Sequence, residues 1–191
     1  IASKTKELVN TQVYVIDKNL LLSLVENAYA RGFADFEKDV LIKQVGELKI
    51  FAREITSYAA VIDDIPGYYK HSMALLDADT RNDLFYGKGT IFTKVKDSVP
   101  VRYMSGAKVK NSLIADGCVI DGTVENSILF RGVHIEKGAV VKNSIIMEKG
   151  TIGERASVVC TITDKNVVIQ PERRLAGYDS YPIVIVKNKI V

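Results

Sequence analysis

The sequence predicts an α/β segment followed by an all-β parallel β-helix. The first half interleaves short β-branched runs with amphipathic helical stretches, whereas four segments of the second half repeat one pattern of residues. Between the halves, Thr93–Ser105 carries Pro100 and no helical periodicity, which is typical of a connector. We therefore divide the chain into residues 1–92, a linker at 93–106 and a β-helix domain at 107–191.

Composition excludes several classes of protein. With 191 residues and 47% apolar composition the chain can bury a substantial core. The 26 Lys and Arg are interspersed with 23 Asp and Glu, so no nucleic-acid partner is expected. No apolar run approaches the roughly 18 residues of a membrane span, and no signal-peptide pattern opens the chain. We expect no membrane partner and a cytoplasmic location, where Cys118 and Cys160 are buried small hydrophobes.

Three helices are expected in the first half, each beginning at a capping residue. Asn19 can cap the first helix, and Asp35 can cap a second that runs to residue 45. Asp64, followed closely by Pro66, begins a third. The stripe of this third helix consists of Tyr68, Tyr69, Met73 and Leu76.

Residues 11–16, 48–55 and 56–62 are the expected strands of the first half, because they are rich in β-branched or aromatic residues. These strands and helices do not make a complete sheet by themselves. They look like the last third of a larger α/β domain.

The repeat in the second half consists of four segments that start at Val109, Val124, Val141 and Val158, with spacings of 15, 17 and 17 residues. A coil of three hexapeptides needs roughly 18 residues, so each segment fits one slightly shortened coil, with strands of successive coils about 4.8 Å apart. Two columns of branched residues are expected to form the core. They are Ile120, Ile135, Ile152 and Ile169 at the last position, and Leu113, Ile128, Ile145 and Ile162 at the fifth. A fourth-position column holds Ser112, Ser127, Ser144 and Thr161.

A β-sandwich is the alternative fold, but it gives no reason for columns of the same residues to recur. The end of a solenoid leaves an unpaired coil edge, which must be capped or covered. The apolar, β-branched segment 175–191 can do this, and we expect self-association or partner association through the β-helix or its exposed end.

Few residues suggest chemistry. His134 could serve as the general base of a hexapeptide acyltransferase, but a zinc carbonic anhydrase would need three histidine ligands and the chain has two histidines. Arg173 and Arg174 could bind a phosphorylated effector. A solvated surface pair is the simpler interpretation, because the carboxylate of Glu172 would repel a phosphate.

The stretch SLIADGCVIDGTVENSILFRGVHIEKGAVVKNSIIM resembles the β-helix of bacterial glucose-1-phosphate adenylyltransferase, also called ADP-glucose pyrophosphorylase. The similarity covers nearly the whole chain and is closest to the non-catalytic, regulatory-type subunit of glycogen biosynthesis. The resemblance implies a left-handed β-helix at 107–191. It also implies that residues 1–92 are the C-terminal portion of a nucleotidyltransferase-like domain.

The family transfers the adenylyl group of ATP to glucose-1-phosphate, and its catalytic members use magnesium. Their Gly-rich nucleotide loop and Glu-Lys-Pro motif do not occur in this chain. Their Tyr-Trp-x-Asp-x-Gly motif corresponds to Tyr58–Asp63, where Val61 occupies the position of the metal-binding Asp. Valine has no oxygen ligand for magnesium. We therefore assign no catalytic residue, metal ligand or cofactor to this chain and identify no substrate-binding residue.

The resemblance implies a regulatory or assembly subunit of the adenylyltransferase, inactive alone. Its expected partner is a catalytic subunit or a second copy of the chain, and a phosphorylated sugar is a candidate effector. Two alternatives stay open: a catalytically active adenylyltransferase subunit and a hexapeptide-repeat acyltransferase.

Overall fold

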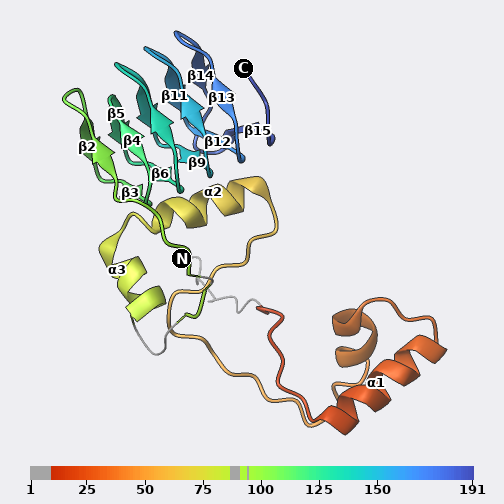
Figure 1. The fold of residues 1–191 in the computed structure, drawn as a ribbon. Coiled ribbons are helices and arrows are strands. Elements are labelled where there is room, and N and C mark those ends of the chain that lie inside the picture. The colour runs from red at the N-terminus through yellow and green to blue at the C-terminus, as the bar shows by residue number, and fades with distance from the viewer. Residues whose placement is uncertain (1–9, 87–90, 94) are drawn as a thin grey trace, which may run out of the picture. The chain divides into compact units, whose positions relative to one another are not determined.

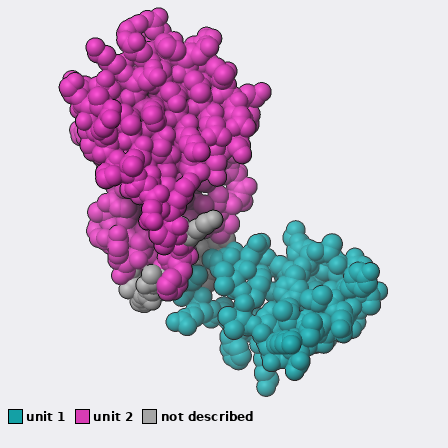
Figure 2. Space-filling view, in the orientation of Figure 1, with its two compact units in different colours: residues 1–56 teal, residues 57–191 magenta. Residues whose placement is uncertain are grey.

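A computed structural model describes residues 10–86, 91–93 and 95–191 (Figure 1). The chain divides into two compact units, a first that ends at Thr56 and a second that spans Ser57–Val191 (Figure 2).

The described part of the first unit, residues 10–56, contains one regular helix, α1 (Lys18–Ala30), and a short π-helical segment, η1 (Phe36–Leu41). The cap of α1 is not Asn19, as predicted, but Asp17, because its carboxylate reaches the free amide groups at the start of the helix. Asp35 caps η1 as predicted, but η1 ends before residue 45 and turns follow. Leu24 of α1 and Val40 of η1 are buried.

The three strands predicted in the first half do not form. Residues 11–16, 48–55 and 56–62 take no strand conformation, and Val15 and Phe51 are exposed. A β-branched run becomes a stable strand only when neighbouring strands satisfy its backbone and bury one of its faces. The sheets of the described residues all lie in the second half of the chain, and none includes these segments.

The second unit begins with helices. Asp64 caps α2 (Ile65–Ala74) as predicted, and its carboxylate accepts a hydrogen bond from the amide of Gly67 at 2.6 Å. A short helix, α3 (Ala78–Arg81), follows after an Asp77 cap and continues into the π-helical segment η2 (Asn82–Tyr86).

Residues 102–185 of the second unit form a parallel β-helix with three five-stranded sheets (Figure 1). The first sheet contains β1 (Arg102–Tyr103), β4 (Val119–Ile120), β7 (His134–Ile135), β10 (Thr151–Ile152) and β13 (Val168–Ile169). The second contains β2 (Lys108–Lys110), β5 (Thr123–Glu125), β8 (Val140–Lys142), β11 (Ser157–Val159) and β14 (Arg174–Ala176). The third contains β3 (Leu113–Ile114), β6 (Ile128–Leu129), β9 (Ile145–Ile146), β12 (Thr161–Thr163) and β15 (Ile183–Ile185).

The predicted linker and C-terminal segment both contribute strands. β1 lies within residues 93–106 and pairs with β4, so part of that segment belongs to the coils rather than to a connector. Residues 175–191 complete a further coil that is longer than the others. Asn166 bonds to Asn188, 22 residues ahead, whereas Ser127 bonds to Ser144, 17 residues ahead.

The corner between the second and third sheets explains the recurring asparagine and serine. Asn111, Asn126 and Asn143 have φ between 44° and 47°, a left-handed conformation that asparagine tolerates better than most residues. The serine that follows turns its hydroxyl back into the corner. Ser144 Oγ donates to the carbonyl of Lys142 at 2.7 Å and accepts from the amide of Thr161 in the next coil at 3.1 Å.

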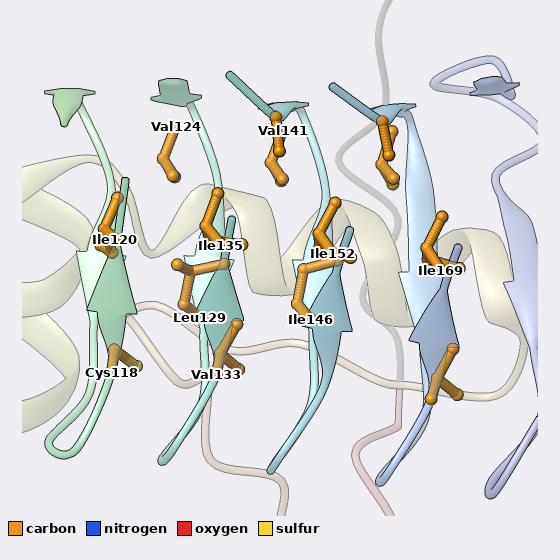
Figure 3. Close-up of a cluster of buried hydrophobic side chains, with 14 of the residues drawn as sticks. Cys118, Ile120, Val124, Leu129, Val133, Ile135, Val141, Ile146, Ile152 and Ile169 are labelled. Atoms are coloured by element: carbon orange, nitrogen blue, oxygen red, sulfur yellow. The ribbon is translucent and has the colours of Figure 1, made fainter. Parts of the chain in front are cut away.

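Inside the coils lies one continuous apolar core (Figure 3). The four isoleucines of the last-position column are at most 1% exposed and stack along its length: Ile120, Ile135, Ile152 and Ile169. Leu129 and Ile146 of the third sheet also point into this core.

The fifth-position column does not lie in the interior, contrary to our prediction. Successive side chains of a strand point to opposite faces, so Ile128 and Ile145 point outward where Leu129 and Ile146 point inward. Leu113 and Ile128 are half-buried, whereas Ile145 and Ile162 are buried in a separate cluster with Tyr69 of α2.

Candidate functional site

Helix α2 lies against the outer face of the third sheet (Figure 1). Tyr69 forms a buried cluster with Ile145 of β9 and Ile162 of β12. Tyr68, Met73 and Met147 pack around this cluster. The outer face of the third sheet is therefore apolar at this point, and α2, which precedes the coils in the sequence, covers it.

The hydroxyl of Tyr69 ties α2 to the coil that contains β8 and β9 and to the last coil. It donates to the carbonyl of Asn143 at 2.6 Å, and Asp179 Oδ1 lies 3.4 Å away. Asp179 belongs to the turn between Tyr178 and Tyr181, which are joined by an antiparallel bridge and lie in the longer last coil. Cys160 Sγ lies 3.2 Å from the same Asp179 oxygen.

The electrostatics keep both groups protonated. Burial, followed by the proximity of Cys160 and Asp179, raises the pKa of the Tyr69 hydroxyl, which therefore stays a neutral donor. Burial and the Asp179 carboxylate raise the pKa of the Cys160 thiol. A nucleophilic cysteine needs the opposite shift, so this arrangement is suited to docking rather than to thiolate catalysis.

Two clefts flank the coils. One, of about 660 Å³, lies beside α2 and is lined by Asp64, Lys70, Tyr69 and the Asp179–Ser180 turn, among others. The other, of about 500 Å³, lies beside residues 95–100, and its lining includes Lys96 and Arg131 as well as Asp97 and Asp116. Its two cations and two carboxylates balance, so it has no net attraction for an anion.

Residues 58–63, to which the family resemblance assigns the metal motif, offer little for magnesium to bind. Val61 is 48% exposed and offers no oxygen. The Tyr58 hydroxyl and His71 Nδ1 form a hydrogen bond of 2.9 Å. The backbone amide of Tyr58 donates to the Asp83 carboxylate. The Asp64 carboxylate caps α2 by accepting from the amide of Gly67. Among the described residues, no three His, Cys, Asp or Glu side chains gather as a metal site.

The other candidates lie apart from one another. His134 is exposed on the first sheet between Val119 and Thr151. Arg173 and Arg174 are exposed, and the neighbouring Glu172 binds the guanidinium of Arg155 at 2.7 Å.

The residues that join α2 to the coils were not recognised as a site from the sequence. The available signal was the pair of consecutive apolar residues in the third-sheet strands β3, β6 and β9, such as Ile145 and Ile146 in β9. A strand with apolar residues on both faces must be covered on both. Asp179 gave no such signal, because its role depends on the extra length of the last coil.

Comparisons with known proteins agree with this architecture. Residues 98–181 match the family model described as GlmU-like, C-terminal hexapeptide, in agreement with the left-handed β-helix that the resemblance implied. Within the described residues, no helix combines the length and apolar character that crossing a bilayer requires.

Full-length relatives extend the match beyond the coils. The chain is 40% identical over 179 residues to the glycogen biosynthesis protein GlgD of Bacillus subtilis (strain 168), a match that covers 94% of this chain and 52% of that protein. It is 42% identical over 130 residues to GlgD of Geobacillus stearothermophilus, covering 68% of this chain and 38% of that protein. It is 36% identical over 145 residues to the glucose-1-phosphate adenylyltransferase of Geobacillus stearothermophilus, a match that covers 74% of this chain and 37% of that protein. The chain thus spans about half the length of the first relative and less of the other two, and it belongs to the family of glucose-1-phosphate adenylyltransferases and the glycogen biosynthesis protein GlgD.

Proposed function

We propose that this chain is part of a regulatory or assembly subunit of glucose-1-phosphate adenylyltransferase in glycogen biosynthesis. In the reaction served, a phosphate oxygen of glucose-1-phosphate attacks the α-phosphorus of ATP, and pyrophosphate leaves as ADP-glucose forms. The observation that carries the proposal is the 40% identity to GlgD, and Val61, which the family resemblance assigns to the metal position, supports it. In the cytoplasm, the catalytic partner holds the magnesium and this subunit adjusts the partner's activity.

The surface of the coils supports an assembly role. The strands β14 and β15 end their sheets at the C-terminal side and pair with no further strand among the described residues, whereas the outer edge of β13 is paired with residues 189–191. Exposed apolar side chains lie at this end, namely Val184, Val186 and Ile190. A catalytic subunit or a second copy of the chain would bury them.

The subunit acts by binding one conformation of its partner better than another. A ligand shifts an equilibrium only by its differential affinity for the two states, so contacts across the interface must differ between the active and inactive partner. An effector, for which a phosphorylated sugar is our proposal, then changes the rate only in the mixed assembly.

The test mixes the full-length protein with its catalytic homologue and follows pyrophosphate release from ATP and glucose-1-phosphate, with and without phosphorylated sugars. We expect no release by the full-length protein alone and a changed rate or effector response in the mixture. An Ile135→Val full-length variant serves as the folded control for Ile135→Asp, which disrupts the coils and should abolish the effect. Substantial release by the full-length protein alone, or an unchanged partner, contradicts the proposal.

A further inference from the structure

Among the described residues of the second unit, two separate apolar clusters form. The larger fills the coils and involves no residue of α2. The smaller joins Tyr69 to the outward-facing Ile145 and Ile162. The coils therefore keep their own core whether or not α2 is present, and breaking the smaller cluster costs only the contacts of one helix face.

One turn closes over this smaller cluster. The Tyr178–Tyr181 turn brings Asp179 to the Tyr69 hydroxyl and the Cys160 thiol. The turn belongs to the last coil, whereas Tyr69 belongs to a helix more than a hundred residues earlier, as their separation of 110 shows. The contact therefore joins two segments that are distant in the sequence.

We propose that α2 is a detachable strap, which leaves the third sheet while the coils stay folded, and that the Tyr178–Tyr181 turn is the latch that keeps it closed. Opening uncovers Ile145 and Ile162 and releases the segment that carries Tyr69. Any partner that prefers the open or the closed form shifts the balance between them. The inference rests on the two clusters and the latch, and it stands independently of the proposed function.

The two cysteines of the chain report on opening separately. Cys160 is 6% exposed beneath the latch, and Cys118 is 0% exposed in the core of the coils. A thiol reagent reaches Cys160 when the strap opens but reaches Cys118 only when the coils themselves unfold. The ratio of the two labelling rates therefore separates local opening from global unfolding.

The experiment measures labelling of each cysteine in the native chain and in Tyr69→Phe, with Tyr68→Phe as the matched control on the same helix. We expect Cys160 to label faster than Cys118 in the native chain. Tyr69→Phe should accelerate Cys160 by roughly two- to tenfold, the range for losing one net hydrogen bond, and leave Cys118 unchanged. Tyr68→Phe should change neither rate by as much.

Phenylalanine keeps the aromatic ring in the smaller cluster, so Tyr69→Phe removes only the contacts of the hydroxyl. Faster labelling of Cys160 with an unchanged Cys118 rate therefore reports opening of the strap. Hydrogen exchange of the amides of residues 65–74 provides a second measurement and should accelerate by the same factor. Equal rates at both cysteines in every variant, or an unchanged Cys160 rate in Tyr69→Phe, would overturn the proposal.

Discussion

Replacing Ser144 by alanine tests the hydrogen-bonded serine column. Ser144 Oγ is fully buried, and it links two coils by accepting from the Thr161 amide at 3.1 Å while donating to the Lys142 carbonyl at 2.7 Å. Alanine leaves the buried amide without its acceptor, which costs about 1–3 kcal/mol. We expect the free energy of unfolding to fall by about 2 kcal/mol, near the middle of that range.

Urea unfolding followed by circular dichroism measures this loss, and two variants bracket it. Ser144→Thr keeps an oxygen at the position, as Thr161 does in the next coil, and should lose much less. Ser112 accepts the equivalent hydrogen bond from the Ser127 amide at 3.2 Å, but Ser112 is half-exposed. In Ser112→Ala, water can therefore partly satisfy the Ser127 amide, and the loss of stability should be smaller. Equal losses for Ser112→Ala and Ser144→Ala would refute the argument from burial.

Three further outcomes follow from the same coils. Asn126→Ala should lower the free energy of unfolding in urea by about 1 kcal/mol, because φ is 45° at this position. Asn126→Gly should lower it less, since glycine adopts this conformation without strain. A larger loss for glycine than for alanine would contradict the role of the left-handed corner. Ile135→Val should lose about 0.5–1.5 kcal/mol, while Ile135→Asp should prevent cooperative folding of the coils by circular dichroism, and a stable Ile135→Asp would refute its interior position. Because the folded-state pKa of Tyr69 is raised, its stabilisation is present below the ordinary tyrosine pKa and is lost as pH rises through the folded-state value. An alkaline absorbance titration should therefore show a late-ionising tyrosine that Tyr69→Phe lacks, and an unchanged titration would contradict this burial.

The repeat predicted the coils because each column must satisfy the same local geometry in every turn. Ile120 and Ile135 recur since they pair directly in register and face one interior. The same periodicity could not tell inside from outside for Ile145, because both faces of its strand are apolar and the covering helix lies far away in the sequence.

The first half was predicted less well. Asp64 identified the start of α2 because capping is a local interaction between a carboxylate and amides within one turn. The strand at residues 11–16 was wrong because strand formation depends on a neighbouring strand, which local sequence does not reveal. Val61 could be interpreted only through the family resemblance, since a single valine carries no signal of a lost metal site.

The most direct test of the central claim, action through a partner, is sedimentation velocity of the full-length protein mixed with its catalytic homologue. The account predicts a boundary heavier than that of either protein alone, and its share should fall when Ile135→Asp replaces the native protein but not when Ile135→Val does. Two independent boundaries, each unchanged from the separate proteins at the highest concentration tested, would contradict it.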